Sequence, residues 1–331
     1  MHWIGIDVSK SKLDMALTNQ HGIVLENKEV KNTSTGITKQ LERWRKKHGL
    51  VHDQCLVCLE PTGHYSDLAV TTLVDLKVPT WLAMPLDIKR SMGLARGKND
   101  RIDAERIAHY ARRHHERSRL ATTATVDALE LKQLLAFRDR LAEDQRRQGV
   151  YISEVHKYAP ATSGKLFDDY SKQRIEEIKL AKKQVDRSIQ EFINNRPALR
   201  KLNILLRSVI GIGPVVAAHL LATTEGFTKF ITPRQLACHC GVAPHSYTSG
   251  TSINGRSRVS PFANKKLKSL LHLAVLGMLN YPNELHDYYD RKKEDGKHAL
   301  LVLNNMKRKL IDRICAVIDR GTPFVAVPSP R

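Results

Sequence analysis

The run Trp3-Ile4-Gly5-Ile6-Asp7-Val8 is a short apolar segment that carries one acid. Its length and apolar character predict a buried β-strand. A carboxylate in such a strand is costly to bury unless a cation or hydrogen-bond donors compensate it. Because a metal ion would remove that cost, Asp7 is a candidate metal ligand.

Three further acids stand in contexts that place them beside Asp7. Glu60 ends a second apolar run, Cys55-Leu56-Val57-Cys58-Leu59, just before Pro61-Thr62-Gly63. It therefore lies at the end of a predicted strand, where α/β folds usually place ligand groups. Asp100 and Asp103 belong to a predicted helix, and positions three apart share one helix face.

Four converging carboxylates indicate a magnesium site. Hard divalent ions such as Mg²⁺ prefer oxygen ligands, and carboxylates that share a site repel one another unless a cation is present. Two such ions roughly 3.5–4 Å apart would form a two-metal phosphodiester site. Each acid taken alone can also be a surface charge, and for Asp103 the charged neighbours Arg101, Glu105 and Arg106 favour that simpler interpretation.

The charge of the chain indicates a nucleic-acid substrate. The 331 residues include 54 Lys and Arg against 34 Asp and Glu, which gives a net charge of +20 and a pI near 9.8. Residues 201–331 hold 19 basic and 8 acidic residues, so they carry more than half of the excess. Residues 226–283 contain no acid but seven basic residues: Lys229, Arg234, Arg256, Arg258, Lys265, Lys266 and Lys268. A merely solubilising surface would mix the two signs, whereas this one predicts salt-dependent phosphate binding.

Cysteine usage and hydropathy predict a cytoplasmic protein. Five cysteines and a first strand almost at Met1 leave no sign of a targeting segment or of disulfides. No apolar run approaches the roughly 20 residues of a membrane span, so no membrane partner is expected. Cys238-His239-Cys240 lacks a second ligand pair at zinc-finger spacing and is interpreted as packing.

The fold class predicted is α/β plus α, in three parts. Residues 1–120 alternate strands (3–8, 13–18, 23–30, 55–60, 79–84) with helices (near 36–47, 64–76 and 99–114). Residues 121–200 predict two charged amphipathic helices, 125–157 and 171–195, with a break at Ser163-Gly164. They could form an antiparallel coiled coil or dimerisation arm, or equally a helical layer on the first part. Residues 201–331 predict a mainly helical part.

Two segments of the last part are candidates for contact with DNA. Gly211-Ile212-Gly213 precedes an apolar helix, whose first amides and Gly-rich turn could hold a phosphate of the DNA backbone. A plain turn between helices explains the same pattern. The segment 244–258 predicts a polar loop rich in hydroxyls, in which Arg256 and Arg258 could stabilise the pentavalent phosphate formed when a serine attacks DNA.

The motifs together resemble the DEDD transposases of insertion-sequence family 110, relatives of the Piv DNA invertase. The resemblance covers nearly the whole chain. It rests on the following segments: Ile4-Gly5-Ile6-Asp7 with Lys10 and Lys12-Leu13-Asp14; Glu60-Pro61-Thr62-Gly63-His64-Tyr65; Lys98-Asn99-Asp100-Arg101-Ile102-Asp103-Ala104; Ile210-Gly211-Ile212-Gly213-Pro214; Gly241-Val242-Ala243-Pro244; and Ser249-Gly250.

The resemblance implies the fold and the chemistry of a recombinase. It implies a RuvC-like, ribonuclease-H-like first domain whose Mg²⁺ ligands are Asp7, Glu60, Asp100 and Asp103. It also implies a C-terminal transposase domain whose nucleophile is Ser249, although Ser246, Ser252, Ser257 and Ser260 compete for that role. Family members cut and rejoin donor and target DNA through a phosphoserine link, in composite sites shared between subunits. A structured noncoding bridge RNA guides them.

We therefore expect a DNA transposase of a bacterial or archaeal insertion sequence that acts as a dimer and then as a tetrameric synapse. Gly211, Gly213, Arg256, Arg258, Lys265, Lys266 and Lys268 are the expected nucleic-acid contacts. One alternative is a RuvC-like nuclease that hydrolyses DNA structures without a covalent adduct. Another is a non-catalytic binding protein whose acids are ordinary surface charge.

Overall fold

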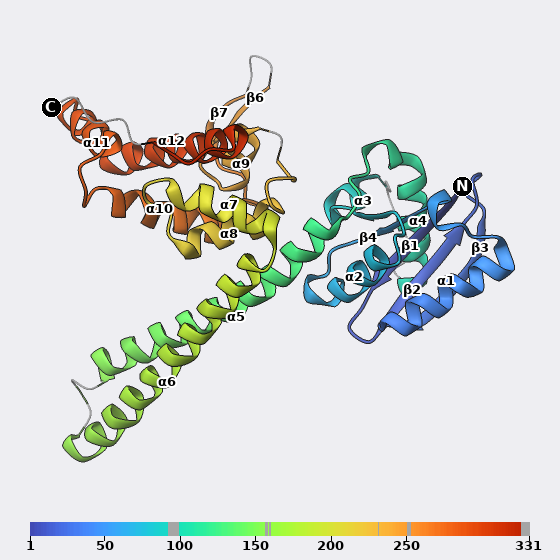
Figure 1. The fold of residues 1–331 in the computed structure, drawn as a ribbon, viewed down its shortest axis with the longest axis horizontal. Helices are drawn as coiled ribbons and strands as arrows, with labels where there is room; N and C mark the ends of the chain where they lie inside the picture. Colours follow the sequence, from blue (N-terminus) through green and yellow to red (C-terminus); the bar gives the residue numbers. More distant parts are fainter. Residues whose placement is uncertain (92–98, 156–157, 159, 231, 250–252, 326–331) are drawn as a thin grey trace. The chain divides into compact units, whose positions relative to one another are not determined.

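The computed structural model of the chain describes residues 1–91, 99–155, 158, 160–230, 232–249 and 253–325 (Figure 1). These residues form two compact units, Met1–Leu129 and Glu130–Arg331. The first is α/β and the second is mainly helical, so the predicted fold class is confirmed. The division into residues 1–120, 121–200 and 201–331 stays a prediction.

A five-stranded mixed sheet forms the centre of the first unit, with the strand order β3-β2-β1-β4-β5. The strands are β1 (His2–Val8), β2 (Lys12–Thr18), β3 (Val24–Lys31), β4 (Cys55–Leu59) and β5 (Thr80–Leu82). The first three pair antiparallel as a meander, whereas β4 lies parallel to β1 and β5 parallel to β4. This is the ribonuclease-H-like arrangement that the sequence predicts.

Helical segments that follow β3, β4 and β5 lie on both faces of the sheet (Figure 1). In chain order these are α1 (Ser34–His48), η1 (His52–Gln54), η2 (Gly63–Tyr65), α2 (Asp67–Asp75), α3 (Pro85–Ser91), α4 (Asp100–His114) and η3 (His115–Arg117). The sequence analysis missed α3, a seven-residue helix that begins at a proline. Proline is favoured at the first helical position, so this signal was present.

Alternation along the central strands separates two cores. Ile4 and Ile6 of β1 lie in the cluster formed with α1 and α2, which contains the fully buried Trp44. Trp3 lies in a second cluster with Cys58 of β4 and residues of α3 and α4. Because successive side chains of a strand point to opposite faces, Asp7 lies on the same face as Trp3, the face that α4 covers.

Gly5 allows α4 to lie almost in contact with the sheet. A Cβ atom added at Gly5 would overlap the carbonyl oxygen of Ala104 and the amide nitrogen of Ala108, and would lie 3.0 Å from the Cα of Ala108. Ala16, which pairs with Gly5 across β1 and β2, packs with the same two alanines. These small side chains let the backbone of the helix rest on the strands and fix where its first turn lies.

The second unit begins within a long helical hairpin. α5 (Thr123–Val155) and α6 (Ala161–Asn194) run antiparallel. Arg138 Nε lies 2.6 Å from Asp186 Oδ1, and Lys182 Nζ lies 2.6 Å from Gln145 Oε1. These contacts show that the two helices pair antiparallel, whereas the coiled coil or dimerisation arm and the helical layer on the first part both stay predictions.

The predicted break at Ser163-Gly164 is wrong, because both residues lie in the first turn of α6. The amide of Gly164 donates to the carbonyl oxygen of Pro160 at 2.8 Å, the first hydrogen bond of the helix. Pro160 occupies the N-cap position. A proline that precedes a helix marks its start, and glycine is tolerated in the first turn.

The rest of the second unit is a helical bundle with one hairpin. Its elements are α7 (Pro197–Ser208), α8 (Pro214–Thr224), α9 (Pro233–His239), β6 (His245–Ser249), β7 (Ile253–Arg258), α10 (Lys265–Met278), α11 (Glu284–Glu294) and α12 (Ala299–Arg320). Buried leucines such as Leu206, Leu221, Leu271 and Leu310 form one core that also takes in residues of α5 and α6. Across the described ranges, no helix combines the length and the apolar character that a membrane span requires.

The polar loop predicted for residues 244–258 is wrong, since most of the segment forms the antiparallel strands β6 and β7. Thr248, Tyr247 and Ile253 favour extended backbone. The abundance of hydroxyls hid this preference. Only Gly250, Thr251 and Ser252, between the two strands, lie outside the described residues.

We expect Gly5→Ala to lower the free energy of unfolding by about 3 kcal/mol, because the added methyl group must push α4 away from β1. Urea unfolding of the two proteins measures this difference. Gly149→Ala in α5 is the control, since a Cβ there meets nothing within 4 Å. It should be neutral or stabilising by up to about 1 kcal/mol, and equal effects of the two substitutions would contradict the close approach described above.

Candidate active site

The sheet brings Asp7 and Glu60 to the same edge. β1 and β4 are parallel, and the last paired residues are Ile6 and Leu59. Asp7 and Glu60 are the next residues of the two strands, so their side chains leave the sheet side by side and on the same face. Both are partly buried.

Helix α4 adds the other two acids to this edge. Asp100 and Asp103 lie in its first turn, which Asn99 caps by accepting a hydrogen bond from the amide of Arg101 at 3.1 Å. The contact of Gly5 with Ala104, the residue that follows Asp103, holds this turn over β1. The structure therefore brings the four acids predicted from the sequence into one region of the first unit.

The four carboxylates influence one another electrostatically. Burial raises the pKa of Asp7 above its ordinary value, and the charges of Asp100, Asp103 and Asp14 raise it further. Burial likewise raises the pKa of Glu60, with further contributions from Asp7 and Asp103. Asp14 was not among the predicted site residues, yet it pairs with Asp7 across the β1–β2 hairpin. Pairing the two predicted strands as a hairpin would have identified Asp14, because it places this acid opposite Asp7.

Two basic residues form ion pairs with the clustered acids. Lys12 Nζ lies 3.3 Å from Asp100 Oδ2, 3.3 Å from Asp14 Oδ2 and 3.0 Å from Glu29 Oε2. These three carboxylates raise the pKa of the Lys12 amine above its usual range. Arg106 Nη1 lies 2.7 Å from Asp103 Oδ1. The positive charges offset part of the repulsion that the clustered acids create.

The donor set suits Mg²⁺, but the side chains are not arranged as a closed cage. Within the part of the chain that the structure describes, no three His, Cys, Asp or Glu side chains stand close enough to hold one ion. All four donors at this edge are carboxylates, the ligands that hard cations prefer. Burial first, and the neighbouring carboxylates second, raise the pKa values of Asp7 and Glu60 and so disfavour their charged forms. A cation is the group that such an edge would bind best.

Ser249 is the last residue of β6 and pairs with Ile253 at the end of the hairpin. Its partner in the sequence motif, Gly250, lies outside the described residues, as does Ser252. The side chains of Ser249 and Arg256 are also outside the described part of the structure, whereas Arg258 ends β7 and is exposed. The hairpin thus carries the predicted nucleophile and both predicted arginines within one short element.

The Gly211-Ile212-Gly213 turn joins α7 to α8, as the sequence predicts. Gly211 has a φ of +87°, and a Cβ there would lie 2.8 Å from Cγ of Met278. A glycine is therefore required at this position by backbone conformation and by packing against α10. Gly213 is the N-cap of α8, and a Cβ there would meet nothing within 4 Å. Packing therefore does not require a glycine at position 213.

The three predicted lysines of α10 differ in their surroundings. Lys265 is exposed, and among the described residues it has no acid beside it. Lys266 Nζ lies 2.7 Å from Asp139 Oδ1 of α5, so its charge is already compensated. Lys268 is partly buried, and its Cδ would lie 3.4 Å from a Cβ added at Gly241.

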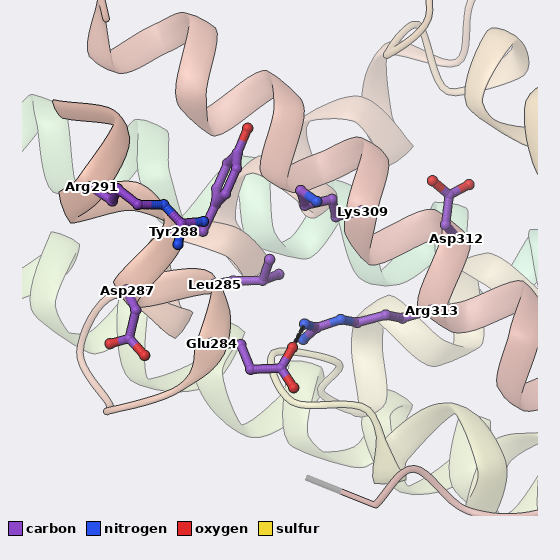
Figure 2. Close-up of a pocket in the computed structure, with 8 residues that line it drawn as sticks. All are labelled: Glu284, Leu285, Asp287, Tyr288, Arg291, Lys309, Asp312 and Arg313. Atoms are coloured by element: carbon purple, nitrogen blue, oxygen red, sulfur yellow. Dashed lines mark hydrogen bonds and ion pairs between the residues drawn. The ribbon is translucent and has the colours of Figure 1, made fainter. Parts of the chain in front are cut away.

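A charged groove of about 610 Å³ lies between α11 and α12 (Figure 2). It is lined by Glu284, Leu285, Asp287, Tyr288, Arg291, Lys309, Asp312 and Arg313. Its charges largely offset one another. Arg313 forms an ion pair with Glu284, and Arg308 Nη2 lies 3.0 Å from Asp312 Oδ1. Lys309 Nζ lies 4.9 Å from the centre of the Tyr288 ring.

Two family models match the chain. A family model for IS110-type DEDD proteins, described as a transposase, matches residues 4–155. A second model, described as transposase IS116/IS110/IS902 family, matches residues 203–290. Together the two matches take in both the four acids and the hairpin that carries Ser249.

Individual proteins are similar to the whole chain or to part of it. The chain is 26% identical to the pilin gene-inverting protein of Moraxella lacunata over 331 residues, which cover 97% of each chain. It is 32% identical to an uncharacterised protein of insertion element IS110 from Streptomyces coelicolor, over 41% of this chain and 33% of that protein. A structure of T. thermophilus RuvC in complex with a Holliday junction substrate matches 37% of this chain and 99% of its own, at 14% identity and a TM-score of 0.28.

We expect Asp7→Asn to stabilise the metal-free protein at neutral pH. The pKa of Asp7 is higher in the folded protein than in the unfolded chain, so the folded state keeps its proton to higher pH. Stability therefore falls as pH rises from the unfolded pKa to the folded pKa, and at neutral pH the charged Asp7 lowers the free energy of unfolding. Removing the charge should raise the Tm by roughly 2–4 °C. Differential scanning calorimetry in the presence of a chelator measures the change.

The exposed Asp53 provides the control, because Asp53→Asn removes an acid of the same unit away from this edge. Its effect should stay within about 0.5 kcal/mol. The difference between the two variants should vanish below the ordinary pKa of a carboxyl group, where Asp7 is protonated in both states. A Tm that falls in Asp7→Asn at neutral pH would mean that the acid is stabilised by partners and not repelled by neighbours.

Proposed function

This chain belongs to the IS110 family of transposases, and from this premise we propose that it recombines DNA through a covalent link to Ser249. The observation that supports the proposal most is the convergence of four acids at one sheet edge, where burial and mutual repulsion raise the pKa values of Asp7 and Glu60. Such an edge suits phosphodiester chemistry. The protein would act in the cytoplasm of a bacterial or archaeal cell.

The acids Asp7, Glu60, Asp100 and Asp103 would hold Mg²⁺. The metal, when bound, would supply positive charge to the scissile phosphate and to the oxygens that attack and leave. For Asp100 to take part, its ion pair with Lys12 would open, and Asp103 would give up part of its contact with Arg106. Lys12 and Arg106 would then face the phosphate that enters the site, and both are suited to bind it.

Ser249 would act as the nucleophile. Its Oγ would attack the phosphorus atom, form an Oγ–P bond and displace the 3′-oxygen of the DNA strand. The serine hydroxyl would lose its proton, and the departing 3′-oxygen would gain one and become a free hydroxyl. Because one phosphodiester replaces another, the energy of the broken bond is kept for rejoining. Attack by a 3′-hydroxyl of the second DNA would reverse the step and release Ser249.

The basic surface of the second unit would hold the nucleic acids. Arg256, Arg258, Lys265 and Lys268 would contact phosphates, and Lys266 would do so after leaving Asp139. Gly213 would let a phosphate approach the first turn of α8, while Gly211 shapes the turn. A structured noncoding RNA would pair with donor and target DNA and supply the sequence choice.

The α5–α6 hairpin would join copies of the chain. Its far end exposes large apolar side chains, Leu166 and Tyr170 of α6 among them, together with Tyr158. Such clusters are uncommon on surfaces that face only solvent. Dimers formed here would then pair into a tetrameric synapse. In functional terms, residues 1–120 would supply the acids, 121–200 the assembly helices and 201–331 the serine.

The covalent step is tested with purified protein, Mg²⁺, guide RNA and labelled donor and target DNA. We expect an adduct between protein and DNA that survives denaturation, together with recombinant product. Ser249→Ala should abolish both, and Asp7→Asn should reduce both by at least about a thousandfold. Denaturing gel electrophoresis measures the adduct.

Ser246→Ala and Ser257→Ala are the matched controls, because both serines lie in the same hairpin. They should retain the adduct. If the adduct persists in Ser249→Ala and disappears in one of the controls, the nucleophile is assigned wrongly. If DNA is cut without any adduct, the protein is a metal-dependent nuclease.

We expect the double substitution Leu166→Glu with Tyr170→Glu to shift the protein toward monomer, since it places charge on the exposed apolar end of α6. Light scattering coupled to size-exclusion chromatography gives the mass. The pair Lys172→Glu with Lys179→Glu, on exposed positions of the same helix, is the control and should leave the mass unchanged. An equal mass for all variants would remove this end of the hairpin from the assembly.

A further inference from the structure

Lys307 of α12 is a buried lysine without an anion. Only 6% of the residue is exposed. Among the described residues, no ion pair or side-chain hydrogen bond involves its amine. Yet Nζ is not among the polar atoms of these residues that are both sealed from solvent and unpartnered. The amine therefore keeps some contact with solvent.

The nearest charge that acts on Lys307 is positive. Burial lowers the pKa of the Lys307 amine, and the charge of Lys268 on α10 lowers it further. Lys268 has no acid beside it in the described part of the unit either. The two helices pack together in the core, where Leu271 and Leu310 are buried. The Lys268 amine is thus close enough to act on the Lys307 amine at a partly apolar site.

Two other cations of this unit each have an acid beside them. Arg138 Nε lies 2.6 Å from Asp186 Oδ1, and Lys266 Nζ lies 2.7 Å from Asp139 Oδ1. A buried charge without a partner is costly, and a second cation nearby increases the cost. An anion bound beside Lys307 would offset this cost.

Both lysines border the segment that leads into the Ser249 hairpin. Asn304, three residues before Lys307 on α12, donates from Nδ2 to the carbonyl oxygen of Val242 at 3.1 Å. A Cβ added at Gly241 would lie 3.4 Å from Cδ of Lys268. Positions three apart share a helix face, so Lys307 lies on the face of α12 that holds the Gly241-Val242 segment.

Glycine is required at position 241 by backbone conformation and by close packing. Its φ is +64°, and a Cβ there would lie 2.9 Å from Cβ of Ala263 and 3.1 Å from Cγ1 of Val259. Val259 follows β7, so the entry and the exit of the hairpin meet at this glycine. The Gly241-Val242-Ala243-Pro244 motif, to which no role has so far been given, therefore forms the foot of the hairpin.

We propose that Lys307 and Lys268 bind a phosphate of the nucleic-acid backbone at the foot of the β6–β7 hairpin. The identity of the anion rests on the function proposed above, whereas the anion site itself does not. β6 has five residues, so about 13 Å of extended strand separates the foot from Ser249. The bound phosphate is therefore not the one that Ser249 attacks. Lys307 is a positioning residue that fixes the strand several nucleotides away from the scissile phosphate.

The groove between α11 and α12 contains acids as well as cations, unlike the described surroundings of Lys307 and Lys268. Its cations share the space with Glu284, Asp287 and Asp312 (Figure 2). Lys309, two residues after Lys307 on the same helix, is exposed and lies over Tyr288. It offers a matched control, since Lys309→Met removes the same charge from the same helix at an exposed position.

The first test uses inorganic phosphate and the intact protein. Lys307→Met should raise the Tm in chloride, because it removes an uncompensated buried charge, whereas Lys309→Met should leave the Tm unchanged. At matched ionic strength, phosphate should raise the Tm of the wild type and of Lys309→Met by at least about 2 °C and leave Lys307→Met unaffected. Equal phosphate shifts in all three proteins, or a Tm that falls in Lys307→Met, would overturn the anion site.

The second test measures binding of the full chain to labelled DNA over a range of salt concentrations. Lys307→Met should weaken binding about tenfold and reduce the slope of log K against log salt by about 0.9, the loss of one phosphate contact. Lys268→Met should act alike, and Lys307→Arg should restore most of the slope. The loss should remain when Mg²⁺ is omitted and in Ser249→Ala, so it does not depend on the covalent step. A different result is that Lys307→Met abolishes the rise of Tm in phosphate and yet leaves the slope of log K against log salt unchanged. That result would mean that the site binds an anion other than the DNA backbone, and it would contradict the proposal.

Discussion

The contact between Gly5 and the backbone of α4 governs the rest of the first unit. Four small residues, Gly5 and Ala16 on the sheet and Ala104 and Ala108 on the helix, remove the side chains that normally separate a helix from a sheet. The helix can then place Asp103, the residue before Ala104, over the end of β1. A glycine in a strand carries an entropic cost. In this protein the glycine allows the close approach of α4, which brings acids from three different elements together.

Burial and mutual repulsion disfavour the charged forms of the gathered acids. Lys12 bridges three carboxylates, and Arg106 holds Asp103, but Asp7 and Glu60 keep raised pKa values. The second unit shows the opposite imbalance at Lys307, where two amines lack an acid. Each unit thus retains charge of one sign at the place where a ligand of the other sign is proposed. Charged groups with shifted pKa values of this kind are common at functional sites.

The sequence was sufficient for the features that depend on local pattern. The apolar runs around Asp7 and before Glu60 predicted β1 and β4, and the segment from Asn99 to Glu105 was predicted as the start of a helix, as α4 confirms. It failed where composition misleads. Hydroxyls concealed the strands β6 and β7, and Ser163-Gly164 suggested a break that Pro160 in fact supplies.

Other features depend on tertiary contacts and leave no local signal. The burial of Lys307 follows from how α12 packs on α10 and on the Gly241-Val242 segment, far away in the sequence. The engagement of Lys12 with Asp100 and of Lys266 with Asp139 follows from the placement of helices. Charge counts treated all lysines alike, whereas the structure separates free, paired and buried ones.

The central claim is that the acids at the end of β1 form the metal site. The most direct measurement is a crystal structure of the protein with Mn²⁺ in place of Mg²⁺, read by anomalous scattering. We expect a peak about 2.0–2.2 Å from carboxylate oxygens of Asp7 and Glu60, with the Lys12–Asp100 ion pair opened. A peak elsewhere, or an edge without a peak in which Lys12 still holds Asp100, would contradict the account.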